Sequence, residues 1–357
     1  PQAFIDPYMG TYDEGWDAIR GARQRRAAAL GVIPPDVAMV GMPTTGDWRA
    51  LDADQRRYEA KRMAVYAGMV EAMDHHIGRL VSYLKSQAQF DNTIFIFTSD
   101  NGAEASGPAD PSAFINRQQT RSLGYQTDYE TLGLKGSYNT ISPSFASAAV
   151  SPLAYYKFYA GEGGMRVPLI VAGAALPRQG VLSDAFSFVT DITPTVLALA
   201  GVKSPDGRHG GRPVESIIGR DLSPVLSGST ERAYSPDDAV GYELAGNAAL
   251  FQGDYKIVVN RKPLGDGEWR LFNIKNDPGE SRDLAQEEPA RLQQMLSAYE
   301  RYQRENKVLD MPAGYGHIKQ LLINTLHQQW RTPLLVGLLT LLILLPFLVA
   351  YLLGRKP

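Results

Sequence analysis

A short apolar run that ends abruptly in polar residues constrains this chain most. Residues 94–97 are β-branched and aromatic, which is typical of a strand buried on both faces of a sheet. The run is followed by Ser99-Asp100-Asn101-Gly102. Ligands of open α/β sheets bind just beyond the carboxyl ends of parallel strands, so Asp100 and Asn101 are predicted to offer oxygen atoms to a hard cation. Asn-Gly is also a common turn signal, and this stretch alone leaves both interpretations open.

A glycine-rich segment further along the chain carries a second set of candidate residues. Lys157 lies five residues ahead of Glu162-Gly163-Gly164, and Arg166 and another apolar strand follow. In this order, the two segments resemble the sulfatase family, specifically its microbial arylsulfatase type. The resemblance implies that Asp100 and Asn101 bind the metal ion, which is calcium by family habit, with magnesium as the alternative. It also implies that Lys157 binds the sulfate group of the substrate.

The resemblance extends over most of the chain, from Tyr12 to about Pro312. Weaker matching segments occur in family order at residues 74–80, 191–197 and 269–273. Residues 52–87 are predicted as a long helix and residues 103–151 as a long loop. Residues 248–251 and 255–259 are predicted as a hairpin, 269–274 as a third strand and 289–305 as a final helix. The predicted elements thus run from helices and buried strands to antiparallel strands with a final helix. We therefore expect an α/β, alkaline-phosphatase-like (sulfatase) core that is incomplete at its N-terminus, with a smaller C-terminal antiparallel-sheet subdomain and a transmembrane helix.

The family's nucleophile is missing from this sequence. Sulfatases convert a cysteine or serine of a Cys/Ser-x-Pro-x-Arg motif to formylglycine, but this chain has no cysteine and no such serine motif. The paired aspartates near the start of a sulfatase are missing too. We expect the chain to be the C-terminal part of a longer enzyme that carries formylglycine in its N-terminal part. The polypeptide alone is expected to be inactive.

The pattern predicts four regions. Residues 1–204 form the α/β portion, 205–310 the α+β subdomain, 311–332 an amphipathic juxtamembrane segment and 333–353 a transmembrane helix. In the juxtamembrane segment, residues recur at helical spacing: Ile318, Leu321, Leu322, Thr325 and Leu326. The formal net charge is −2, which does not favour a nucleic acid as a partner.

The C-terminal apolar run predicts a membrane anchor. Residues 333–353 carry no charge, and a helix of this length spans roughly 30 Å, the thickness of a bilayer core. Arg355 and Lys356 follow at once, which predicts a cytoplasmic C-terminus and a single pass. The globular part would then be periplasmic or otherwise extracytoplasmic.

Two functions fit these observations. One is a membrane-anchored sulfatase that hydrolyses sulfate esters of the aryl type, with His209 as a further candidate for substrate binding. The other is a catalytically inactive, sulfatase-like subunit that binds other membrane proteins. Two-zinc phosphatase relatives tend to carry Asp-His in place of Asp100-Asn101, and the five histidines here show no clear zinc-ligand spacing.

Overall fold

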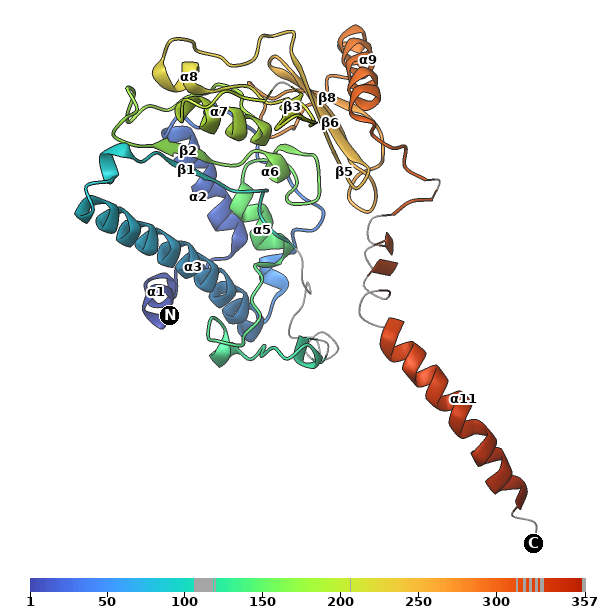
Figure 1. Cartoon of the computed structure of the whole chain (residues 1–357). Coiled ribbons are helices and arrows are strands. Elements are labelled where there is room, and N and C mark those ends of the chain that lie inside the picture. The colour runs from blue at the N-terminus through green and yellow to red at the C-terminus, as the bar shows by residue number, and fades with distance from the viewer. Residues whose placement is uncertain are drawn as a thin grey trace.

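The computed structural model describes residues 1–105, 118, 120–205, 207–312, 314–316, 319, 320, 323, 324, 327 and 331–354. Figure 1 shows an α/β body, a four-stranded sheet with helix α9 beside it, and helix α11 projecting away from both. The body contains a series of helices and short helical turns before its first strand: α1 (Gln2–Ile5), η1 (Asp6–Tyr8), α2 (Trp16–Ala29), η2 (Trp48–Ala50), α3 (Ala53–Ser86) and η3 (Phe90–Asn92).

A capping box fixes the start of helix α3. Asp52 and Gln55 form a capping box, in which the Asp52 carboxylate accepts from the Gln55 backbone N–H at 2.8 Å and the Gln55 side chain accepts from the Asp52 N–H at 3.0 Å. Residues 59–65 of the helix are buried, including Met63, Ala64 and Val65. The second half differs from a core helix, because its apolar stripe is exposed.

The two apolar strands of the body pair with each other, but not as predicted. β1 (Phe95–Thr98) pairs with β2 (Leu169–Ala172) in an antiparallel, two-stranded sheet. The expectation of parallel strands buried on both faces was therefore wrong for this pair. β1 is only half-buried and most of β2 is exposed. The apolar composition of both segments correctly predicted strands. Burial on both faces needs further strands or helices packed on them, and the described residues do not provide these.

The region between β1 and β2 is more ordered than its composition suggested. Residues 103–151 were predicted as a long loop, but they contain η4 (Tyr129–Thr131) and α5 (Ser142–Val150). Helix α6 (Glu162–Met165) follows that range. Phe145 on α5 is fully buried and meets Trp16 and Trp48 edge to face. These small-residue segments thus supply the centre of the body's core. The part of the prediction that concerns residues 106–117 and 119 lies outside the described residues.

The chain continues through short elements into a regular antiparallel sheet. The short elements are η5 (Val189–Asp191), α7 (Ile192–Leu199), β3 (Arg208–His209), β4 (Arg212–Pro213) and α8 (Ser223–Ser227). The sheet has the order β5 (Ala239–Leu244), β6 (Asn247–Gln252), β7 (Tyr255–Val259) and β8 (Arg270–Asn273), followed by α9 (Pro289–Asn306). The predicted hairpin, third strand and helix are confirmed, whereas β5 was not predicted.

Successive side chains of each strand point to opposite faces of the sheet. Both faces of this sheet are buried. Leu250, Ile257 and Leu271 point to α9 and pack with Met295 and Tyr299. On the other face a second cluster joins the sheet to the α/β body: Ala160, Ala249, Phe251, Val258 and Phe272. This second face matters for the site, since it places the sheet directly behind the loop that follows Lys157.

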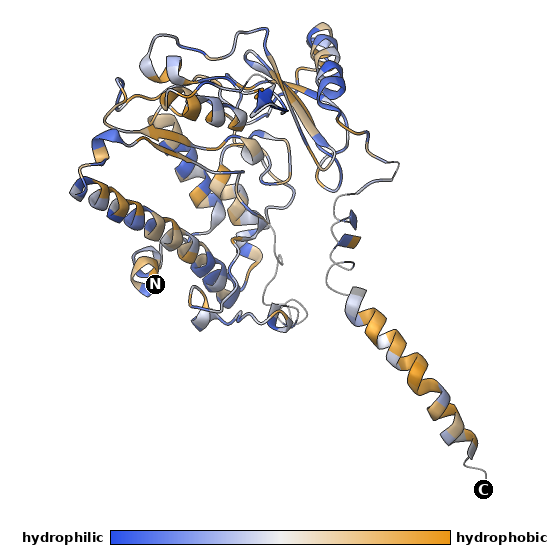
Figure 2. Ribbon diagram, viewed as in Figure 1, coloured by the Kyte–Doolittle hydropathy of each residue, from blue (hydrophilic) through white to orange (hydrophobic). Residues whose placement is uncertain are grey.

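The C-terminal helix α11 (Arg331–Gly354) covers the predicted transmembrane run. Its span Thr332–Tyr351 has a mean hydropathy of 2.6 and none of it is buried. Figure 2 shows it as hydrophobic over most of its length, without a polar stripe. Length and composition suit a membrane span, which alone is weak support, so the anchor stays a prediction. Arg355, Lys356 and the five positions named in the amphipathic segment lie outside the described residues.

Candidate active site

The fold brings the two predicted motifs side by side. The backbone N–H of Lys157 donates to the carbonyl of Ala103 at 3.1 Å, and the Gly102 N–H donates to the carbonyl of Gly164 at 2.9 Å. Residues 102 and 103 therefore contact Gly164 and Lys157 through the backbone. Asp100 and Asn101 follow β1 directly, as predicted, and Asp100 is exposed.

Glycine is required where the two segments touch. A Cβ atom built on Gly102 would lie 1.8 Å from the carbonyl oxygen of Gly163, a backbone atom that no rotamer change can move. A Cβ on Gly163 would in turn lie 2.3 Å from the Tyr155 carbonyl oxygen. The Asn-Gly dipeptide is thus more than a turn signal, because its glycine permits the close approach of the second motif.

Lys157 itself lies at the junction with its side chain about one-third exposed. Its ammonium group is 2.5 Å from the carboxylate of Glu104, which is also only partly buried. Sequence reasoning missed Glu104, although it stands four residues after Asp100. The pair shows that the Lys157 side chain extends toward the segment that carries the proposed metal ligands.

Two buried asparagines hold the loop that begins at Lys157. The Asn247 amide donates to the Phe158 carbonyl at 2.6 Å, while Asn260 accepts from the Ala160 N–H at 2.8 Å. Phe158 has a φ of 79°, which is unfavourable for a side-chain-bearing residue and persists only when neighbours fix it. Both asparagines belong to the C-terminal sheet region, so that sheet positions the lysine loop.

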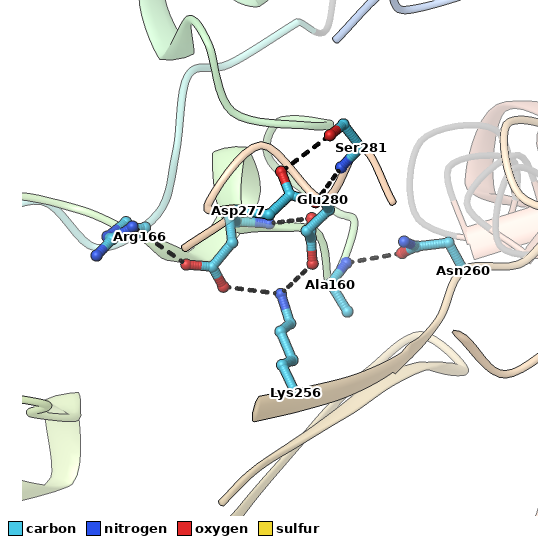
Figure 3. Close-up of polar contacts among 8 residues, drawn as sticks. Ala160, Arg166, Lys256, Asn260, Asp277, Glu280 and Ser281 are labelled. Atoms are coloured by element: carbon cyan, nitrogen blue, oxygen red, sulfur yellow. Dashed lines mark hydrogen bonds and ion pairs between the residues drawn. The ribbon is translucent and has the colours of Figure 1, made fainter. Parts of the chain in front are cut away.

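A buried charge cluster holds the same loop at Glu162. The Lys256 ammonium group donates to Glu162 and to Glu280 at 2.9 Å each, and all three side chains are at least 96% buried. Glu280 also accepts from the Glu162 backbone N–H at 2.8 Å. Figure 3 shows Lys256 rising from β7 toward Glu280, with Arg166 nearby. The Arg166 guanidinium group approaches the Glu162 carboxylate to 3.9 Å.

The cluster holds two acids and one fully buried base. Burial is the largest influence on Glu280, and it raises the pKa of that carboxyl to about 7 even though Lys256 acts in the opposite direction. Burial alone would lower the pKa of Lys256, but the charges of Glu162 and Glu280 outweigh it and raise that pKa. Lys256 is therefore a charged structural group at neutral pH.

Asp100 and Asn101 carry the type of donor atom that suits a calcium ion. Asp100 and Asn101 supply the carboxylate and amide oxygens that calcium prefers, yet calcium takes six to eight oxygen ligands. No cluster of three or more histidine, cysteine, aspartate or glutamate side chains suited to a metal ion occurs in the described part of the chain. A complete site at Asp100 would need ligands beyond that set. His209 lies exposed on β3, and no hydrogen bond or ion pair joins it to Lys157 or Asp100 among the described residues.

The sulfatase family model matches residues 2–202, which is more than half of the 357 residues. The chain belongs to the sulfatase family. Its α/β body with an antiparallel sheet thus represents the alkaline-phosphatase-like fold class of sulfatases, as the resemblance implied. The boundaries of the four predicted regions stay predictions.

Individual sulfatases match with moderate identity. An uncharacterized sulfatase of Schizosaccharomyces pombe is 34% identical over 318 residues, covering 88% of this chain and 57% of the relative. The arylsulfatase of Klebsiella aerogenes is 31% identical over 228 residues, covering 63% of this chain and 48% of the relative. A structure solved with its substrate D-glucosamine-2-N,6-O-disulfate has a TM-score of 0.47 at 22% identity, covering 73% of this chain and 44% of that chain. The sulfatase chain spans about half the length of the curated relatives it matches.

The contact at Gly102 yields a first prediction for this sulfatase. Gly102→Ala should lower the free energy of unfolding by about 1–3 kcal/mol, because the methyl group must push the two segments apart. Urea unfolding measures this loss. Gly41→Ala is the matched control, since a Cβ there meets no atom within 4 Å and should leave stability nearly unchanged. Equal stability of the two variants would show that the segments do not touch as described.

Proposed function

We propose that this chain is the membrane-anchored, metal- and sulfate-binding part of a sulfatase that hydrolyses sulfate esters of the aryl type. Asp100 and Asn101 bind calcium, Lys157 binds the sulfate, and formylglycine is supplied by polypeptide outside this sequence. The carrying observation is the backbone pairing of residues 102–103 with Gly164 and Lys157, which sets both candidate groups at one junction. Membership of the sulfatase family supports the reaction class.

The residues of the junction suit the charge changes of sulfate-ester hydrolysis. The Lys157 ammonium group would hold sulfate oxygens and oppose the negative charge that grows on them in the transition state. A bound calcium ion would supply further positive charge at the same oxygens. Glu104 would share Lys157 with the substrate, or release it when sulfate enters. His209 stays a candidate for contact with the organic part of the ester.

One observation favours the second candidate, an inactive subunit of a membrane complex. Lys157 is already paired with Glu104 at 2.5 Å, and a carboxylate in that place competes with sulfate for the lysine. If this pair is permanent, the site does not bind sulfate. The two functions differ in whether sulfate separates the pair, which a direct experiment can decide.

Calcium binding and turnover test the proposal together. A protein that combines this chain with the polypeptide supplying formylglycine should hydrolyse an aryl sulfate. It should lose that activity when a chelator is added and regain it with Ca²⁺. Thermal unfolding provides a readout independent of turnover: saturating Ca²⁺ at a hundred times its Kd should stabilise the protein by about 2.7 kcal/mol. Asp100→Ala should abolish this shift, whereas Asp91→Ala, at the surface ahead of β1, should keep it. No shift in the wild-type protein would refute the metal site.

Membrane attachment is tested by removing the tail. Deletion of residues 312–357 should move the protein from the membrane fraction to the soluble fraction, because it removes the apolar helix that suits a bilayer. Protease added to the outer face of sealed cells, stripped of any outer barrier, should digest the globular part of the wild-type protein. Digestion from the cytoplasmic side alone would reverse the proposed orientation. Attachment that survives the deletion would show another anchor.

A further inference from the structure

A cavity of about 430 Å³ lies between the C-terminal sheet, helix α9 and residues 308–311, which follow α9. The backbone N–H of Val308 donates to the Gln303 carbonyl at 3.0 Å, so the chain turns back over the end of α9. The segment then stays against the sheet, since a Cβ atom built on Gly246 would lie 2.9 Å from Met311 Cγ. All walls of this α9 cavity therefore belong to one part of the described chain, and neither Asp100 nor Lys157 lines it.

Aromatic side chains form one wall of the α9 cavity. Trp269 and Tyr299 both line it, and their ring centroids are 4.9 Å apart. Tyr302 continues the row at 5.9 Å from Tyr299. Burial first, and then the charge of Glu243, raise the pKa of Tyr299 to about 12. Its ring is therefore that of a neutral phenol at physiological pH, and it lies within the electrostatic reach of an acid.

The charged side chains at the cavity are mostly acidic: Glu243, Glu300 and Asp310, against Arg261 alone. None of the ion pairs within the described chain engages these three acids, although Asp266 in the same subdomain pairs with Arg270. The Arg261 side chain is directed to the backbone, since its Nε donates to the Gly246 carbonyl at 2.7 Å. Negative charge is therefore left without an ionic partner beside the aromatic wall.

We propose that the α9 cavity binds an organic ammonium ion. The faces of the Trp269 and Tyr299 rings attract a cation through their quadrupoles, and the carboxylates supply the opposite charge. A metal ion fits less well, because it needs several oxygen ligands close together. The described residues hold no group of three or more acids or histidines with that spacing. An anion would meet the charge of three acids and only one base.

The ammonium group has two possible sources, because residues 308–311 lead along the chain toward the apolar helix α11. One source is a free small molecule, and the other is the headgroup of a lipid such as phosphatidylcholine. The recognised group is the same in both. The inference goes beyond sulfate-ester hydrolysis and uses neither the metal ligands nor Lys157, so it holds whether or not the protein is catalytic.

Titration calorimetry with two probes of the same shape tests the site. The full chain is kept in a maltoside detergent, which carries no ammonium group, at constant ionic strength. Choline is the cationic probe, and 3,3-dimethylbutan-1-ol is its neutral counterpart, with carbon in place of the charged nitrogen. We expect choline to bind at least about tenfold more tightly than the alcohol, because the alcohol lacks the charge that the rings and carboxylates attract.

Substitutions separate the contributions of the rings and the acids. Trp269→Leu should weaken choline binding by about tenfold, whereas Trp269→Phe should retain most of the affinity because it keeps a ring. Glu300→Gln and Asp310→Asn, both at exposed positions, should each weaken binding by about two- to fivefold. Glu305→Gln is the matched control, since Glu305 is an exposed acid of α9 that does not line the cavity. Circular dichroism checks that each variant is folded.

Three outcomes would overturn the proposal: no binding of choline, equal affinity for the two probes, or wild-type affinity in the double variant Glu300→Gln/Asp310→Asn. The double variant keeps the test decisive even if Trp269→Leu fails to fold, because both of its positions are exposed. A competition experiment then identifies the source. Displacement of choline by dihexanoylphosphatidylcholine, but not by dihexanoylphosphatidylglycerol, supports a lipid headgroup. Choline that neither lipid displaces supports a free ammonium compound.

Discussion

Replacing Lys157 by alanine in the active, complete protein is expected to lower kcat/KM for an aryl sulfate by about a hundredfold or more, which corresponds to about 2.7 kcal/mol of transition-state stabilisation. The physical reason is that the ammonium group meets the sulfate oxygens where negative charge grows. The side chain is about one-third exposed and extends toward the segment after β1, so a ligand can reach it. Steady-state kinetics with an aryl sulfate measures the loss.

Two further variants make this test specific. Lys203→Ala removes an exposed lysine that lies just after α7, and it should leave kcat/KM unchanged while altering the net charge by the same amount. Glu104→Gln removes the carboxylate that competes for Lys157, so KM should fall or stay the same in an enzyme whose lysine binds sulfate. Wild-type kinetics in Lys157→Ala would refute the sulfate-binding role. A Glu104→Gln variant that is as inactive as Lys157→Ala would show that the pair is structural.

Replacing Lys256 by methionine is expected to lower the free energy of unfolding by about 3–5 kcal/mol, the usual cost of breaking a buried ion pair on one side. Lys256 is fully buried between Glu162 and Glu280, and methionine fills a similar volume without a charge. The two carboxylates would then face each other without a compensating cation. Urea unfolding of the tail-deleted protein measures the loss, with Lys262→Met at the surface as the matched control.

The loss in Lys256→Met should depend on pH. The pKa of Glu280 in the folded protein is about 7, above its ordinary value of 4.5. Folding therefore favours the protonated acid, and its contribution to stability is complete below about pH 4.5 and declines as pH rises through 7. Without Lys256, ionisation of the buried Glu280 is still less favourable. The free energy of unfolding of the variant should therefore be closest to the wild-type value at low pH and differ most above pH 7. A loss that is independent of pH would mean that the cluster is open to water.

Local patterns in the sequence determined most elements and both motifs. The period of apolar residues predicts α3, and the pattern from residue 248 onward predicts three of the four strands of the C-terminal sheet. Short-range signals suffice in these places because capping, turns and alternation act over a few residues. The end of the predicted strand marked Asp100 and Asn101 as candidate ligands, whereas the resemblance to sulfatases singled out Lys157, and the roles of all three stay predictions.

Only the tertiary structure decided what these elements meet. Lys256 finds Glu162 and Glu280 across 94 and 24 residues of sequence, and no local pattern indicates such a cluster. β1 pairs antiparallel with β2 and stays half-buried, although its composition predicts burial on both faces. Apolar composition states that a strand or helix face needs a partner, but it does not state which segment provides it. The exposed stripe of α3 follows the same principle: its sequence determines the apolar face, and the three-dimensional structure shows that the described chain leaves it uncovered.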